Sequence, residues 1–97
     1  MTGMRRDARP EEDGQYPYPV MKPGEYGKDC HGNWMCCPPQ PEGDPWDYFR
    51  GNISKHTVVE HADGTITVSP SILITKYRED GPREWHGYLE NGIWRVC

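Results

Sequence analysis

Proline is the residue that most constrains the fold of this chain, because eight of its ten prolines lie within residues 1–45. Proline fixes the backbone angle φ, lacks an amide hydrogen and pushes the preceding residue toward extended geometry. Helix is therefore excluded over most of this segment, which we call the arm. We expect the arm to be extended, with turns at Lys22-Pro23-Gly24 and Glu42-Gly43.

The aliphatic residues are concentrated after the arm. Val20 is the only isoleucine, leucine or valine before Ile53, whereas the rest of the chain holds enough of them for one small core. We therefore predict that the arm, residues 1–45, precedes an antiparallel β-domain, residues 46–97, which contains the core. An arm without a core does not offset its ordering entropy and would be disordered alone.

Turn dipeptides divide the second half into strands. Asp63-Gly64 and Asn91-Gly92 are typical of two-residue hairpin turns, because both supply positive φ values. The first turn predicts Val59 opposite Val68, and the second predicts Leu89 opposite Trp94. The resulting fold class is mainly β: a small antiparallel five-stranded sheet, folded as a sandwich or partial barrel, with an extended Pro-rich N-terminal arm. The expected strands span residues 54–62, 65–69, 71–77, 83–90 and 93–97.

Charge and hydropathy argue against two classes of partner. The formal net charge is −4 with mixed signs, so no basic stripe is present to neutralise nucleic-acid phosphates. The first residues lack the apolar stretch of a secretory signal, and the longest aliphatic run spans only residues 72–74. We expect neither a nucleic-acid partner nor a membrane partner.

Three cysteines and a histidine cluster within residues 30–37, and His86 and Cys97 are predicted to face each other at the last hairpin. The candidate zinc ligands are Cys30, Cys36, Cys37, His86 and Cys97. Their spacing is not that of a zinc knuckle, so we expect no metal or other cofactor, and Cys36 or Cys37 serves instead as a small buried hydrophobe. The His86–Cys97 pair lacks a following backbone for an oxyanion hole, which indicates a cross-strand contact rather than an enzyme.

Aromatic residues are the candidate partner-binding groups. Large rigid rings beside prolines anchor an extended segment at low entropic cost. Tyr88 and Arg95 face each other across the last hairpin with Trp85 nearby, which indicates either an exposed binding surface or a simple cross-strand pair. The predicted partner-binding residues are Tyr16, Tyr18, Trp34, Trp46, Trp85, Tyr88 and Arg95.

Two motifs resemble a family of small, uncharacterised β-proteins encoded by tailed bacteriophages and prophages. These motifs are the strand from Thr67 through Ser69-Pro70-Ser71-Ile72 and the hairpin from Trp85-His86-Gly87-Tyr88 to Asn91-Gly92. The likeness spans roughly residue 46 to residue 97. Family members carry two further thiols, whereas here Gln40 follows Cys37-Pro38-Pro39 and Trp85 precedes His86. The resemblance implies a phage origin and no particular mechanism.

These observations together predict a non-enzymatic bacteriophage virion accessory protein, such as a capsid decoration or minor structural protein. It would bind neighbouring subunits through both its arm and its β-domain. Its partners would be other virion proteins, among them the major capsid protein, and its location the virion, assembled in the host cytoplasm. The same interpretation allows a homo-oligomer within the assembly. The alternative is a soluble phage-encoded interaction module that acts on host proteins, with zinc as a stabiliser.

Overall fold

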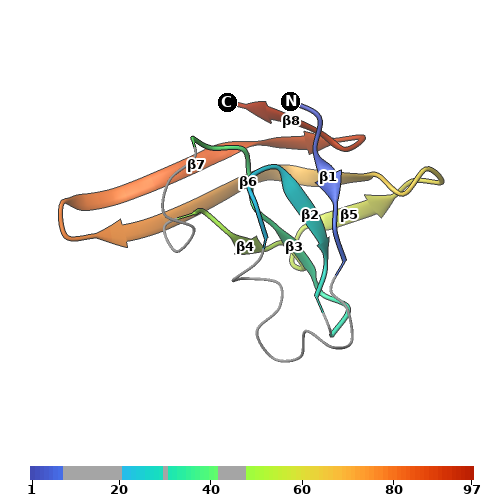
Figure 1. Ribbon diagram of the computed structural model, residues 1–97, viewed down its shortest axis with the longest axis horizontal. Helices are drawn as coiled ribbons and strands as arrows, with labels where there is room; N and C mark the ends of the chain where they lie inside the picture. Colours follow the sequence, from blue (N-terminus) through green and yellow to red (C-terminus); the bar gives the residue numbers. More distant parts are fainter. Residues whose placement is uncertain (8–20, 30, 42–47) are drawn as a thin grey trace.

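The computed structural model of the protein describes residues 1–7, 21–29, 31–41 and 48–97. The fold is mainly β, as predicted, and consists of two four-stranded sheets whose facing residues share a core (Figure 1). The described strands form no closed barrel, and they are eight strands in two sheets rather than the five predicted, an arrangement compatible with a small β-sandwich. None of the described residues forms a helix long and apolar enough to cross a membrane.

The first sheet takes three of its four strands from the arm. Strand β1 runs parallel to β2, and the pairs β2–β3 and β3–β4 are antiparallel. The turn predicted at Lys22-Pro23-Gly24 is confirmed, because the Glu25 amide donates to the Lys22 carbonyl at 3.0 Å and Gly24 has a φ of 92°. In sheet order the strands are β1 (Met4–Arg5), β2 (Glu25–Lys28), β3 (Trp34–Cys36) and β4 (Gly51–Asn52).

The second sheet is antiparallel throughout and contains the longest strands. In sheet order these are β5 (Thr57–Glu60), β6 (Ile66–Arg78), β7 (Gly81–Glu90) and β8 (Ile93–Val96). The strand boundary predicted at Pro70 is not observed, although the ladder to β7 is interrupted around this residue. β6 continues through the cis Ser69–Pro70 bond, and only its register against β7 shifts, between Val68 and Ile72. The ends of β6 and β7 project beyond the other strands as a long ribbon (Figure 1).

The two predicted hairpin registers have different outcomes. At Asn91-Gly92 the register is confirmed, with Leu89 opposite Trp94 and Tyr88 opposite Arg95. At Asp63-Gly64 the predicted register is off by one residue, because Val58, not Val59, lies opposite Val68. The His61 amide donates to the Thr65 carbonyl at 2.8 Å, which closes a three-residue loop with a left-handed glycine rather than a two-residue loop.

The main core lies between the sheets and draws on both halves of the chain. Its buried members are Tyr26, Cys36 and Ile53 from the first-sheet side and Ile66, Val68, Ile72, Trp85, Leu89 and Trp94 from the second sheet. The expectation that the core is confined to residues 46–97 is therefore wrong. The boundary at residues 45 and 46 also falls within one sheet, since β4 pairs with β3.

A second, smaller cluster covers the opposite face of the first sheet. It contains Met21, Met35 and Cys37, with Tyr48 packed against it. Successive side chains of a strand point to opposite faces, so the run Met35-Cys36-Cys37 alternates between the two clusters. The first sheet is thus buried on both faces at its centre.

A pair of tryptophans closes the main core at the last hairpin. The rings of Trp85 and Trp94 meet edge to face, with centroids 5.5 Å apart, and Trp94 Nε1 donates to the Gly24 carbonyl at 2.9 Å. Gly87 must be small here, because a Cβ atom would lie 2.6 Å from the Trp85 ring and 2.2 Å from the Arg95 carbonyl. The glycine lets β7 and β8 approach beneath the ring.

Candidate interaction surface

The face of the second sheet that points away from the core carries several exposed apolar and aromatic side chains. Alternation along β6 and β7 places Ile72, Trp85 and Leu89 toward the core. The residues between them point outward: Leu73, Thr75 and Tyr77 of β6, and Glu84, His86 and Tyr88 of β7. We call these six residues, together with Arg95 of β8 opposite Tyr88, the outer face. The exposed fractions of its apolar and aromatic members reach 55% at Leu73 and 83% at Tyr77.

Tyr88 and Arg95 form the predicted cross-strand pair. The Arg95 guanidinium carbon lies 5.3 Å from the centre of the Tyr88 ring, and Arg95 Nη2 also donates to Glu90 Oε1. A hydrogen bond with Cys97 raises the pKa of the Tyr88 hydroxyl. The arrangement fixes a cationic and aromatic pair on exposed strands, so the position of the predicted pair is confirmed while its role in binding stays a prediction.

His86 lies beside this pair on the outer face. Its Nε2 is 2.8 Å from Ser71 Oγ, and its ring is 6.5 Å from that of Tyr88. The Cys97 amide donates to the His86 carbonyl at 3.0 Å, as expected for residues at the end of the same hairpin. This backbone hydrogen bond is the contact that the structure shows between His86 and Cys97.

Trp85 does not belong to the exposed surface. Only 7% of it is accessible, and its Nε1 donates to the Pro39 carbonyl at 3.1 Å. The prediction of Trp85 as a partner-binding residue is corrected on this ground, because a ring in the core offers no face to another molecule. The same hydrogen bond attaches the arm to the second sheet.

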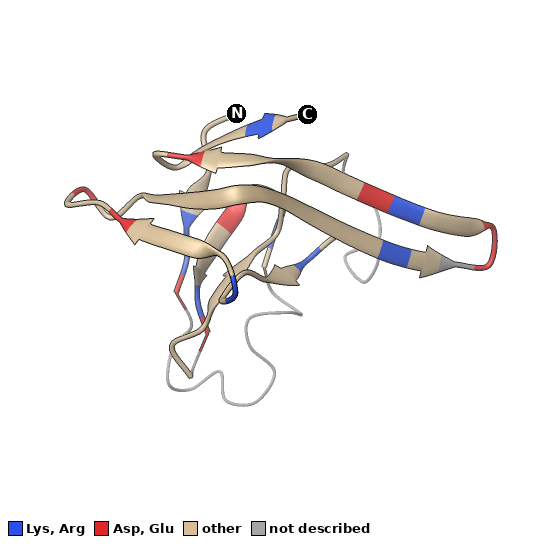
Figure 2. Cartoon of the chain, turned by 180° about the vertical axis from the view of Figure 1, so that it is seen from behind, with Lys and Arg blue, Asp and Glu red and all other residues tan. Residues whose placement is uncertain are grey.

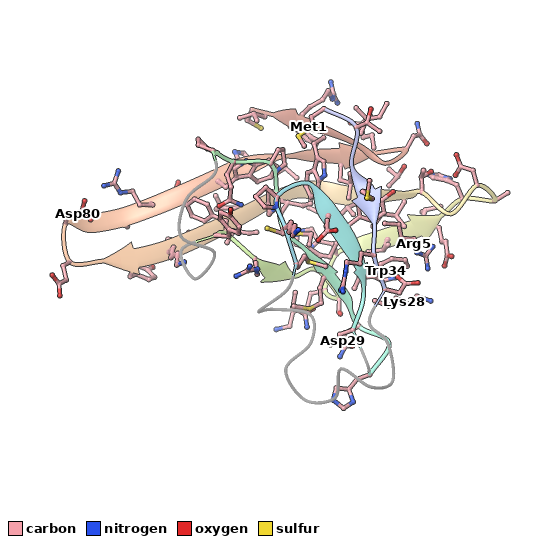
Figure 3. All side chains as sticks on the ribbon, in the orientation of Figure 1. Met1, Arg5, Lys28, Asp29, Trp34 and Asp80 are labelled. Carbon is pink, nitrogen blue, oxygen red and sulfur yellow. The ribbon has the colours of Figure 1, made fainter. Side chains whose placement is uncertain are left out.

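Trp34 is half-buried and is engaged within the chain. Arg5 and Lys28 each place their cationic group 5.1 Å from the centre of its ring (Figure 3). Such contacts stabilise a folded protein by about 0.5–1 kcal/mol each at exposed sites. Trp34 therefore holds β1 and β2 in place, and binding by this residue would require these contacts to be kept or exchanged.

Arg5 joins the two sheets through an ion-pair network. Its Nη1 donates to Glu60 Oε2 at 2.7 Å and to the Gly64 carbonyl at 3.0 Å, and its Nη2 lies 3.1 Å from Asp7 Oδ2. Burial alone would raise the pKa of Asp7, but hydrogen bonds from Arg5 and the Lys28 amide lower it. The hydrogen bond from Arg5 likewise lowers the pKa of Glu60. Both carboxylates are thus held ionised against one guanidinium.

The candidate zinc ligands are not brought together among the described residues. Cys36 and Cys37 are both fully buried and point to opposite faces of the first sheet. Burial raises the pKa of the Cys36 thiol far above its usual range and that of Cys37 to about 12. His86 and Cys97 are exposed at the last hairpin, and no group of three potential metal ligands occurs within the described segments.

Four predicted site residues, Tyr16, Tyr18, Cys30 and Trp46, lie outside the described residues. The outer face also contains residues that the sequence interpretation did not single out. Leu73 and Tyr77 could have been found from strict alternation, because both stand at odd positions of β6, whereas Ile72 and Ile74, at even positions, pack toward the core. Comparison with family models, with curated proteins and with solved structures finds no match for this chain.

Proposed function

We propose that this protein is a non-enzymatic bacteriophage virion accessory protein, which binds neighbouring virion subunits through the outer face of the second sheet. The observation that carries the proposal is the outer face, which exposes Leu73 and Tyr77 on the projecting part of the second sheet and Tyr88 where β7 pairs with β8. The projection of β6 and β7 beyond the other strands is visible in Figure 1. The resemblance of residues 46–97 to phage-encoded β-proteins supports the virion as the setting.

The chemistry of the outer face suits protein recognition. Tyrosine and arginine are the residue types most enriched among those that dominate binding energy at protein interfaces. The Arg95 guanidinium already lies over the Tyr88 ring, with its carbon 5.3 Å from the ring centre. Little side-chain freedom is therefore lost when a partner covers the pair. Other virion proteins, including the major capsid protein, are the partners that this proposal names.

Association with purified particles tests the proposal. The tagged protein is added to particles of the encoding phage that lack it, and the bound fraction is measured after gradient sedimentation. We expect Tyr88→Ala combined with Arg95→Ala to weaken binding by roughly thirtyfold or more, as for loss of about 2 kcal/mol at an interface. Val96→Ala is the matched control, because Val96 is 67% exposed on the same strand but lies opposite Gly87 on the other face.

Three results of this assay decide the matter. Co-sedimentation that the double variant abolishes and Val96→Ala preserves supports the proposal. A protein that never sediments with particles but is recovered with a host protein from infected cells would favour the alternative, a module that acts on host proteins. Binding that survives the double variant and is lost on substitution of Tyr16 and Tyr18 would move the binding surface to the arm.

A further inference from the structure

Between Leu73 and His86, the strands β6 and β7 form a ribbon without a third described strand on either side. β5 pairs with β6 only as far as Ser69, and β8 pairs with β7 only from Gly87. In an antiparallel pair, the backbone groups of every second residue point away from the partner strand. No described strand pairs with the outward-pointing groups of this ribbon, so these groups can pair with another chain.

Two contacts establish which residues point outward on each edge. His56 Nε2 lies 3.2 Å from the Ser71 carbonyl, and the Cys97 amide donates to the His86 carbonyl at 3.0 Å, both from outside the ribbon. Because the direction of the backbone groups repeats every second residue, those of Leu73, Thr75 and Tyr77 point away from β7 as the Ser71 carbonyl does. By the same alternation from His86, the backbone groups of Pro82 and Glu84, their cross-strand neighbours on the β7 edge, point away from β6.

The two edges differ in how well they are protected. On the β7 edge, Pro82 has no amide hydrogen to donate and Glu84 carries a charge, which are two features that prevent pairing at sheet edges. On the β6 edge, Leu73, Thr75 and Tyr77 are uncharged, and all three are exposed. An edge of this kind is suited to the addition of a further strand.

We propose that a second copy of this chain occupies the β6 edge, in an antiparallel pairing centred on Thr75. The segment Leu73-Ile74-Thr75-Lys76-Tyr77 is compatible with itself in this register. Thr75 lies opposite Thr75 of the other copy, Leu73 lies opposite Tyr77, and Ile74 lies opposite Lys76, so no like charges are directly opposed. The three outward-pointing positions form hydrogen-bonded pairs, each with two backbone hydrogen bonds. Two-fold symmetry makes the interface closed.

Charge complementarity at the ends of the edge supports this register. The pairing that places Thr75 opposite itself also places Glu79 opposite Ser71, whose carbonyl His56 contacts. Glu79 of one copy, in the acidic turn at the tip of the ribbon in Figure 2, thus comes close to His56 of the other, which Lys55 precedes in the chain, and symmetry repeats the contact. The edge is only about 17 Å long, so the dimer belongs to the weak, transient class of interfaces.

A matched pair of proline substitutions tests the proposal with purified protein. Thr75→Pro and Glu84→Pro each remove an outward-pointing amide from one edge, at directly opposite positions of the same ribbon, without removing a β6–β7 hydrogen bond. Sedimentation equilibrium up to about 1 mM protein covers the range of weak self-association. We expect the wild type and Glu84→Pro to approach the dimer mass, and Thr75→Pro to stay monomeric. Circular dichroism melting shows whether each variant is folded.

Cross-linking tests the register and does not depend on a proline variant folding. Thr75 lies opposite its own copy at a Cα separation of about 5.5 Å, which permits a disulfide, whereas two copies of Leu73 lie far apart in the same pairing. In a Cys30→Ser, Cys97→Ser background under a mild oxidant, Thr75→Cys should form a covalent dimer and Leu73→Cys should not.

Several results would overturn the proposal. These are a monomeric wild type over the whole concentration range, dimerisation of a folded Thr75→Pro equal to that of Glu84→Pro, or equal cross-linking at positions 73 and 75. A monomer that binds an extended peptide at this edge would also overturn it, since the occupant would then be another protein. The outcome is separate from the virion proposal, because these measurements need no particle and leave Tyr88 and Arg95 unchanged.

Discussion

At the scale of single residues, alternation along strands explains which side chains could be predicted. The Asn91-Gly92 turn placed Tyr88 opposite Arg95, and the structure agrees. Trp85 was expected at the surface, although the same period of two that turns Leu89 inward also turns Gly87 and Trp85 inward. The signal was present in the sequence. The prediction relied on the closeness of Trp85 to Tyr88 in the sequence. Residues three positions apart in a strand point to opposite faces, so Trp85 points inward where Tyr88 points outward.

The same alternation decides the chemistry of the cysteines. We predict that in a Cys30→Ser variant a thiol reagent such as Ellman's reagent modifies one cysteine, Cys97, while the protein is native. Cys36 and Cys37 are buried and the pKa values of their thiols are raised. Neither residue therefore forms the reactive thiolate, and the reagent does not reach either of them. All three should react in denaturant.

Cys97→Ser in the same background is the control and should remove the rapid reaction. Fast modification of a second thiol in the native protein would contradict the burial of the vicinal pair. Because Cys36 and Cys37 lie on opposite faces, addition of zinc should not change the number of protected thiols among these three.

At the scale of elements, loop length was the feature that the sequence left open. Asp63-Gly64 and Asn91-Gly92 have the same turn chemistry, yet only the second makes the predicted two-residue loop. Asp63 Oδ1 accepts from the Thr65 amide at 3.0 Å and from its hydroxyl at 2.6 Å, which stabilises the longer loop. The change of one residue moves Val59 outward and Glu60 toward Arg5, a contact that no local pattern contained.

The ion pairs of Arg5 with Asp7 and Glu60, which join β1 to β5, should make the free energy of unfolding depend on pH in the acid range. The folded-state pKa values of Asp7 and Glu60 lie below the ordinary values of 3.8 and 4.5, so their stabilisation is complete above those values. It is lost as the pH falls through the lowered folded-state values. We expect Arg5→Met to lower the free energy of unfolding by about 1 kcal/mol at neutral pH. The deficit should shrink at about pH 2, below both ordinary values.

Urea denaturation at several pH values measures this dependence. Arg83→Met is the control, because Arg83 pairs with Asp80 at 2.5 Å on the exposed turn, and its removal should change stability little at any pH. A deficit for Arg5→Met that is the same at neutral and acid pH would show that the network acts through packing rather than charge.

At the scale of the whole molecule, the fold class was predictable and the extent of the core was not. Isoleucine, leucine and valine predict a core only after residue 45, because residues 1–45 contain only Val20. That segment contributes Met21, Tyr26, Met35, Cys36 and Cys37 instead. Tyrosine, methionine and cysteine bury apolar area without an aliphatic signature, so a proline-rich segment supplies strands to a sheet.

This shared core leads us to expect that residues 46–97 alone do not unfold cooperatively. Removal of residues 1–45 exposes Trp94, Leu89 and Ile66, which the arm side of the sandwich covers through Tyr26 and Cys36. The truncated chain should bind a hydrophobic dye and show no sharp thermal transition. Addition of a peptide of residues 1–45 should restore part of the transition, and a sharp transition without it would establish residues 46–97 as an independent domain.

The hydrogen bond from Trp94 Nε1 to the Gly24 carbonyl joins residues that are 70 positions apart. The β6–β7 and β7–β8 hairpins are local and can form early, but this bond and the union of the two sheets require closure of a long loop first. The rate-limiting step of folding should therefore be the docking of the two sheets. During synthesis on the ribosome, the first sheet has to wait for β8 before its Tyr26 face is covered.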